Sequence, residues 1–115
     1  MIFVFAEDAT LHVVADINAV RVMCESIDVE SDVYSFYNAE GRPLKARFIT
    51  PNRQRRLFGL LSTLEQGEYT LEVGNPAEHD PISVALAETA ALERNDWFND
   101  LNAVREYLHG CGALD

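Results

Sequence analysis

The stretch VYSFYNAEGRPLKARF, residues 33–48, decides the fold because it predicts a β-hairpin. Residues 33–37 are mostly β-branched or aromatic, which is typical of a strand. Residues 38–43 (NAEGRP) supply turn chemistry, and residues 44–48 alternate apolar with basic side chains. This alternation predicts Leu44, Ala46 and Phe48 facing inward, with Lys45 and Arg47 facing outward.

The chain before the hairpin predicts a strand and a helix. Residues 2–6 (IFVFA) are apolar throughout, as in a buried strand. Residues 11–14 form either a second short strand or the approach to a helix. Asp16 is placed to cap that helix, because its carboxylate can accept backbone N–H bonds. The helix is predicted to run for about three turns, since apolar residues recur every three or four positions at Ile17, Val20, Met23 or Cys24, and Ile27.

After the hairpin, the pattern predicts a loop and two more strands. Residues 50–56 are polar and contain a proline, which predicts a loop. Residues 57–61 could form a strand or a short helix, and the turn-like residues after them favour a strand. Residues 68–73 alternate, which predicts a strand with Tyr69, Leu71 and Val73 inward and Glu68, Thr70 and Glu72 outward.

The C-terminal third predicts two helices. Asp80 and Pro81 are a cap and a first-turn proline ahead of a helix that runs from Ile82 to Leu92. Residues 95–99 then break the chain and carry Trp97 and Phe98, which we expect to plug the core, or alternatively to anchor a partner. Asp100 should cap the final helix, which buries Leu101, Val104 and Leu108 and ends at Gly110 as a C′ glycine.

These elements predict a single α+β domain over residues 1–115. We expect an antiparallel sheet of about four to six strands, with an early helix and two C-terminal helices packed on one of its faces. The expectation follows from the order of the chain, in which most strands precede the last two helices.

Charge is the most informative property of the composition. The net charge is −10, which argues against nonspecific binding to DNA or RNA because phosphate repels such a surface. Residues 41–64 nevertheless hold six of the nine Lys and Arg residues and no Asp or Glu. The rest of the chain therefore has three cations against 19 carboxylates and could steer a basic partner into contact, or serve solubility alone.

The basic segment 42–56 has its own alternatives. We expect it to pair internally with the acidic excess, but it could instead bind phosphate as part of a regulatory or nucleic-acid-binding module. In that module, four rings would stack on bases beside the cations: Tyr34, Phe36, Tyr37 and Phe48.

No arrangement of residues predicts catalysis, a metal site or a cofactor. The three histidines and two cysteines lack the paired spacings of zinc ligands, and no glycine-rich phosphate loop occurs. Cys24 falls in the apolar helical pattern and should be a buried thiol, whereas Cys111 should be exposed. A small enzyme that uses His109 and Cys111 is the remaining catalytic alternative. The sequence also has no apolar run long enough to cross a membrane and no secretory signal, so we expect a cytoplasmic location.

Residues 26–44 (SIDVESDVYSFYNAEGRPL) carry a resemblance to known proteins. The end of a helix is followed by Ile-Asp-Val and then by Y-x-x-Y-N-A-x-G-x-x-L. This pattern resembles that of small bacterial proteins in polymorphic-toxin loci, including immunity proteins of contact-dependent growth inhibition. The resemblance implies a cytoplasmic protein that binds one cognate toxin domain, often a nuclease, and blocks its active site. It transfers no binding residue, because the group shares a role across many folds.

The candidate contacts with such a toxin are two groups of carboxylates, because an acidic surface can replace phosphate in a basic groove. Both groups could equally be solvated surface. The first group follows the early helix, and the second lies on or beside the late strand: Glu25, Asp28, Glu30 and Asp32, then Glu65, Glu68 and Glu72.

Overall fold

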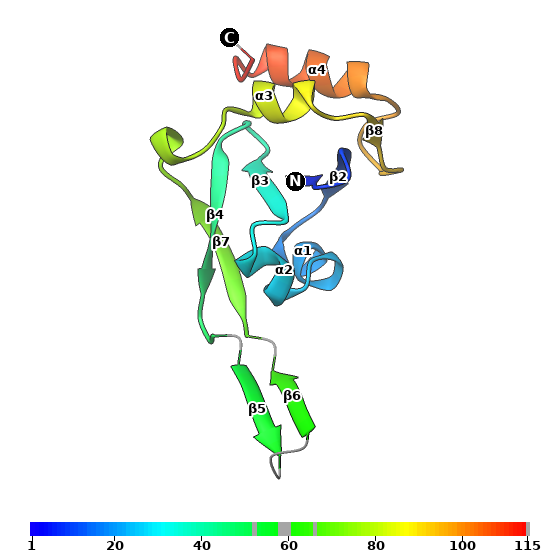
Figure 1. Ribbon diagram of the computed structural model, residues 1–115. Coiled ribbons are helices and arrows are strands. Elements are labelled where there is room, and N and C mark those ends of the chain that lie inside the picture. Colours follow the sequence, from blue (N-terminus) through cyan, green and yellow to red (C-terminus); the bar gives the residue numbers. More distant parts are fainter. Residues whose placement is uncertain (52, 58–60, 66, 115) are drawn as a thin grey trace.

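The computed structural model describes residues 1–51, 53–57, 61–65 and 67–114, and it has an α+β fold. A six-stranded sheet has the order β7-β4-β3-β1-β2-β8, and a separate two-stranded ribbon, β5-β6, extends beyond the ends of β4 and β7 (Figure 1). The strands are β1 (Ile2–Ala6), β2 (Thr10–Val14), β3 (Tyr34–Asn38), β4 (Pro43–Phe48), β5 (Arg53–Leu57), β6 (Leu61–Glu65), β7 (Tyr69–Val73) and β8 (Ala91–Leu92). The helices are α1 (Ile17–Met23), α2 (Ser26–Glu30), the 3-10 helix η1 (Pro76–Glu78), α3 (Ile82–Ala87) and α4 (Leu101–Gly110).

The sheet is mixed, so the prediction of a purely antiparallel sheet is wrong. β8 pairs with β2 in parallel, with Thr10 opposite Ala91 and Leu11 opposite Leu92, and the other neighbours are antiparallel. The predicted helix 82–92 accordingly ends early, at Ala87. The backbone N–H groups of Ala90 and Glu93 donate to the carbonyls of Ala9 and Leu11, at 2.8 and 2.9 Å. These bonds hold the two residues between them, Ala91 and Leu92, at the edge of the sheet as β8.

The early helical stretch divides into two helices. The predicted three-turn helix stops after Met23, because Cys24 adopts an extended conformation with φ −110° and ψ 111°. The hydroxyl of Tyr69 donates to the Cys24 carbonyl at 2.8 Å and so satisfies the acceptor that a continuing helix would use. The chain then turns into α2, so a tertiary hydrogen bond overrides the helical periodicity of the sequence.

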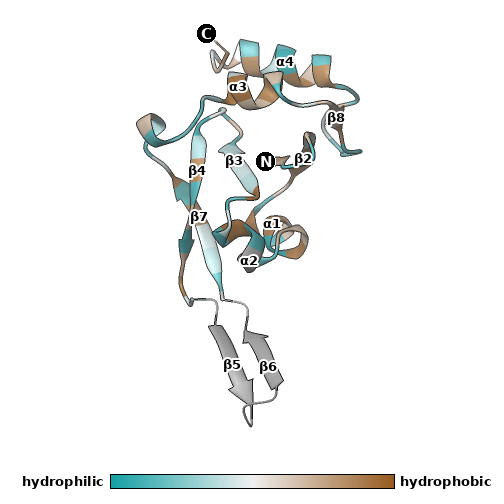
Figure 2. Cartoon of the chain, in the orientation of Figure 1, coloured by the Kyte–Doolittle hydropathy of each residue, from teal (hydrophilic) through white to brown (hydrophobic). Residues whose placement is uncertain are grey.

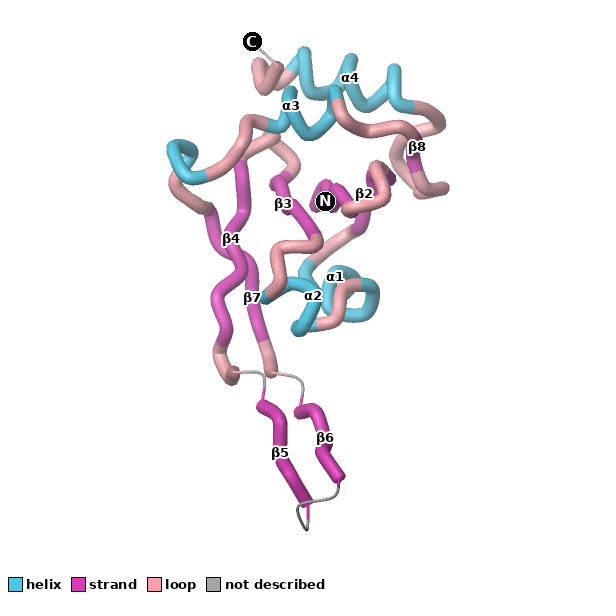
Figure 3. Tube along the Cα trace, in the orientation of Figure 1, coloured by secondary structure: helices cyan, strands magenta, loops and turns pink. Residues whose placement is uncertain are grey.

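Helices cover both faces of the sheet, and the prediction that they share one face is wrong. Along β1, Phe3 and Phe5 pack with the buried residues of α3 and α4, whereas Val4 packs with those of α1 and α2. Since successive side chains of a strand point to opposite faces, the two helix pairs lie on opposite sides. In Figures 1 and 3, α3 and α4 lie together at one end, away from α1 and α2.

The predicted hairpin is confirmed, as are both carboxylate caps. Leu44, Ala46 and Phe48 pack against the core, while Lys45 and Arg47 are exposed. The side chains of Asp16 and Asp100 accept backbone N–H bonds from Ala19 and Ala103, at 2.9 and 2.8 Å. Polar and apolar residues alternate along α4, as Figure 2 shows, and Val104 and Leu108 are buried.

Three local predictions are wrong. Residues 53–57 form β5 instead of a loop, and its register pairs Arg53 with Glu65. The strand predicted over 57–61 lies mostly outside the described residues and is not counted among the three, and of its residues Leu57 ends β5 and Leu61 begins β6. Val73 is 61% exposed instead of facing inward, at the end of the edge strand β7. The N-cap of α3 is Pro81 instead of Asp80, and no side chain accepts a hydrogen bond at this helix start.

The C-terminal turn and the aromatic pair differ in part from expectation. Gly110 is still helical, and the left-handed glycine is Gly112, with φ +74°. Phe98 packs against the core as predicted, with its ring 5.5 Å from that of Tyr107. Trp97 is 44% exposed, so only one ring of the pair plugs the core.

Candidate functional site

A groove of about 780 Å³ lies where β3 and β4 diverge. The two strands pair at Phe36 with Leu44 and at Tyr37 with Pro43, next to the hairpin turn. Beyond these pairs, two residues of β3 and three of β4 line the groove: Tyr34 and Ser35, then Lys45, Ala46 and Phe48. The groove therefore opens within the sheet and exposes strand backbone as well as side chains.

Carboxylates dominate the charge of the groove. Among the described residues that line the groove, six are acidic, and a single one, Lys45, is a lysine or arginine. They come from the β1–β2 turn, from the end of α2 and from the η1–α3 segment: Glu7, Glu30, Asp32, Glu78, Asp80 and Glu88. Such a concentration of one sign of charge attracts cations and focuses the field of a chain that is already acidic.

The wall formed by η1 and α3 is fixed to the sheet. The buried ring of Tyr37 lies edge-on to that of Phe5, with centroids 5.4 Å apart, and its hydroxyl donates to the Asp80 carbonyl at 2.6 Å. Burial raises the pKa of the Tyr37 hydroxyl, and the charge of Asp80 adds to the effect. The hydroxyl therefore stays protonated as a donor, and this bond holds the Asp80 backbone beside the groove.

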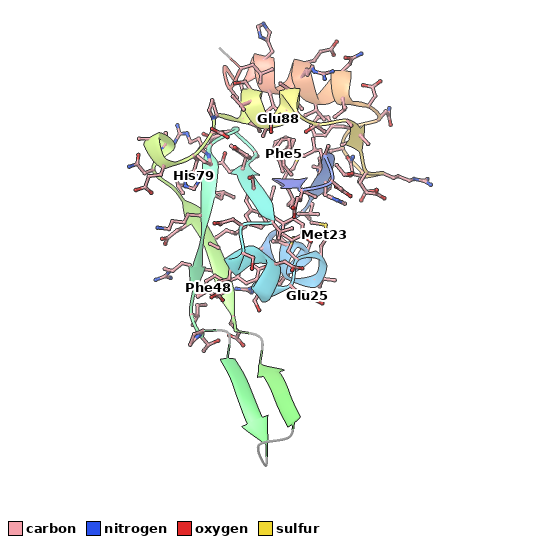
Figure 4. All side chains as sticks on the ribbon, viewed as in Figure 1. Phe5, Met23, Glu25, Phe48, His79 and Glu88 are labelled. Atoms are coloured by element: carbon pink, nitrogen blue, oxygen red, sulfur yellow. The ribbon has the colours of Figure 1, made fainter. Side chains whose placement is uncertain are left out.

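His79 lies in the same wall and packs against a glycine. A side chain at Gly74 would place its Cβ 2.7 Å from the His79 Nε2, so the close approach depends on glycine. The Nε2 is buried and has no hydrogen-bond partner among the described residues. Figure 4 labels His79 together with three other lining residues of the groove, Phe5, Phe48 and Glu88.

The first predicted group of carboxylates contributes to the groove in part. Glu30 and Asp32 line it. Glu25 and Asp28 lie outside the groove lining, near the Tyr34 hydroxyl. Burial is the main cause of the raised pKa of Tyr34, and the charges of these two carboxylates add to it. Asp32 has a positive φ of 58°, as fits the turn between α2 and β3.

The second predicted group is spread over separate places. Glu68 lines a smaller cavity of about 290 Å³ with Arg21 and Tyr69. Glu72 forms an exposed ion pair with Arg47 at 3.5 Å. Glu65 belongs to β6, and its side chain lies outside the described part. Of the predicted contact residues whose side chains are described, Glu30 and Asp32 line the groove, whereas Glu25, Asp28, Glu68 and Glu72 lie outside it.

Sequence reasoning missed most of the groove. Glu7, Glu78, Asp80 and Glu88 are far from Glu30 in the sequence, and only the fold brings them to one cavity. The signal in the sequence that bears on them is the large excess of carboxylates outside residues 41–64, and this excess does not indicate which carboxylates share a site.

The basic segment pairs partly with nearby carboxylates. Arg42 lies 3.6 Å from Glu40, and Arg47 pairs with Glu72, both at exposed positions where such pairs contribute little stability. The side chains of the three arginines in β5 lie outside the described part. Phe36 and Tyr37 are buried, so these two rings cannot stack on bases as a nucleic-acid platform requires.

The thiols differ in environment, as the sequence predicted. Cys24 is fully buried, and burial raises its pKa to about 11 although a hydrogen bond with Tyr34 opposes the shift. A thiol with so high a pKa is a poor nucleophile at neutral pH. Cys111 is exposed, directly after α4. Burial raises the pKa of the Tyr107 hydroxyl, and a hydrogen bond between Tyr107 and Cys111 raises it further.

Within the described residues, no group of three or more His, Cys, Asp or Glu side chains is arranged to hold a metal ion, and no helix has the length and hydropathy to span a membrane. The chain matches no protein-family model, no curated protein and no solved structure.

Proposed function

We propose that this chain is a cytoplasmic immunity protein, which binds a cognate toxin domain with nuclease activity and covers the active site of that domain. The observation that carries the proposal is the groove between β3 and β4, whose described lining includes six carboxylates and one lysine. A toxin that cleaves nucleic acid needs a basic surface to hold phosphate, and carboxylates compete for the same surface.

The resemblance and the groove involve the same part of the chain. Residues 26–44, which resemble immunity proteins, include α2, β3 and the beginning of β4. Glu30 and Asp32 within this stretch line the groove, as does β3, one of the two strands that diverge to form it. The segment that suggests the function therefore also contributes part of the lining of the proposed contact site.

Electrostatic steering gives such a protein a kinetic advantage. An inhibitor must reach its toxin before the toxin reaches its substrate, and complementary charge raises association rates well above those of neutral surfaces. The net charge of −10 attracts a basic toxin over a long range, and the acidic groove is the site where the toxin then binds.

Co-expression with the product of the neighbouring upstream gene tests the proposal. If that product is the toxin, the chain should rescue growth and form a one-to-one complex with it. The triple variant Glu78→Gln, Asp80→Asn and Glu88→Gln should rescue less well and associate more slowly, because it removes three groove charges. The matched control Glu93→Gln, Asp96→Asn and Glu106→Gln removes three exposed charges outside the groove lining and should rescue normally.

Two results would count against the proposal. A chain that neither binds nor protects cells from the neighbouring product is not its inhibitor. Equal loss of rescue in both triple variants would mean that net charge matters and that the groove is not the contact site.

A further inference from the structure

The edges of β3 and β4 that face the groove are available for strand pairing. On its other side, β3 pairs with β1 over all of residues 34–38, and β4 pairs with β7 from Leu44 to Phe48. Toward each other, the register of the described strands joins only Phe36 with Leu44 and Tyr37 with Pro43. The backbone around Tyr34 and Ser35, and that around Ala46 and Phe48, therefore borders the groove instead of a neighbouring strand.

The geometry points to an extended, basic segment of the partner that enters this groove and pairs through its backbone with the open edges of β3 and β4. This inference rests on the proposed function, since it specifies how the partner is held. An open strand edge is a template for another extended chain, and main-chain hydrogen bonds give such contacts their strength.

The dimensions fit a short strand. Strands rise about 3.3 Å per residue, so the edge from Lys45 to Phe48 can accompany about four residues of an incoming chain. The groove volume of about 780 Å³ leaves room for their side chains. The divergence begins next to the hairpin turn, so the segment enters from the end where the two strands lie farther apart.

The charges on both faces define the chemistry of the segment. Alternate side chains of an inserted strand point to opposite faces of the sheet. Glu30 and Asp32 come from the α2 side, whereas Glu78, Asp80 and Glu88 come from the side of α3. Lysine or arginine side chains of the segment would therefore meet carboxylates on either face.

A synthetic probe tests the inference without knowledge of the partner. The probe is a capped eight-residue peptide in which two lysines alternate with two valines, so that each face of the strand carries lysine, and its affinity for the full chain is measured by titration calorimetry at low salt. Two further peptides carry N-methyl groups on alternate residues, one on each edge of the strand. They keep the charge but lose backbone donors, and we expect at least one of them to bind about tenfold more weakly.

Hydrogen exchange locates the contact. The unmodified peptide should slow exchange of the backbone amides that point to the groove, those of Tyr34, Ala46 and Phe48, because the amides between them face β1 and β7. The triple variant Glu78→Gln, Asp80→Asn and Glu88→Gln should bind the peptide more weakly. The control Glu93→Gln, Asp96→Asn and Glu106→Gln should bind it like the original chain. Protection at a different strand, such as the outer edge of β7, would overturn the inference.

The outcomes separate the binding mode from the proposed function. Equal affinity of all three peptides, with loss in the groove variant, would overturn strand pairing and leave a charge-based contact. Absence of binding by the unmodified peptide would also overturn it. Rescue of cells from the toxin is measured independently, so the immunity function would survive either result.

Discussion

Cys24 connects the chemistry of single residues to stability. Its thiol is fully buried at the end of α1, and burial raises its pKa from 9.0 to about 11. In the unfolded chain the thiol loses its proton as the pH passes 9.0, whereas the folded protein keeps it. The stabilisation is thus fully present below pH 9.0 and is lost as the pH rises toward 11. We predict that the free energy of unfolding, measured by urea denaturation, falls by about 1–2 kcal/mol between pH 8 and pH 10.

Two variants identify the group responsible. Cys24→Ala should lower stability at pH 7, because it leaves a small cavity, but it should flatten the alkaline loss. Cys111→Ala removes an exposed thiol and should leave the pH dependence unchanged. If Cys24→Ala retains the full alkaline loss, the tyrosines are its cause, and Tyr69 is the first to consider since burial raises its pKa to about 12.

At the scale of elements, Gly41 holds the β3–β4 turn against the C-terminal helices. Its φ is +81°, and a Cβ there would lie 2.6 Å from the Cβ of Ala113 and 3.3 Å from Ile82. The neighbouring turn is fastened by the Tyr107 hydroxyl, which donates to the Ala39 carbonyl at 2.6 Å. Gly41→Ala should therefore combine backbone strain with a clash and cost about 2–4 kcal/mol in thermal or urea unfolding.

Two other glycines separate the two causes. Gly112 also has a positive φ, of +74°, but open space around its Cβ position, so Gly112→Ala should cost only the backbone strain of about 1 kcal/mol. Gly110 lies in α4 with nothing near its Cβ position, and Gly110→Ala should be neutral or stabilising. A Gly41→Ala variant no less stable than Gly112→Ala would show that the turn moves away from the helices at little cost.

The sequence predicts those elements whose signals are local. The hairpin at residues 33–48 and the helix caps at Asp16 and Asp100 depend on neighbours within a few positions, and all are confirmed. The end of α1 at Cys24 depends on Tyr69, which lies 45 residues away, so periodicity continued the helix too far. β8 is similar, because Ala91 and Leu92 become a strand only beside β2.

The groove could not be predicted for the same reason. Alternation gave Leu44, Ala46 and Phe48 their correct face, but it contains no information on how far β3 and β4 stay paired. Glu30 and Asp32 were candidate contacts, while Glu78 and Glu88 reach the same cavity only through the packing of η1 and α3. Charge composition predicted an acidic surface and could not place it.

At the scale of the whole molecule, the groove concentrates like charges in a chain of net charge −10. Carboxylates that share one cavity repel each other, and the repulsion opposes folding. The variant Glu78→Gln, Asp80→Asn and Glu88→Gln should therefore melt about 2–5 °C higher than the original chain at low salt, which corresponds to a gain of about 0.5–1 kcal/mol. Salt should narrow the difference, since it screens exposed charges.

The control Glu93→Gln, Asp96→Asn and Glu106→Gln separates repulsion within the groove from the effect of net charge. It removes the same number of charges, but Arg94 and Arg105 are adjacent to these positions in the sequence, so it should gain less stability. A lower melting temperature in the groove variant would mean that the carboxylates stabilise the chain internally and are not held for a partner. A higher melting temperature in the groove variant would mean that the groove carboxylates lower the stability of the free chain, and a basic segment bound in the groove would offset that loss.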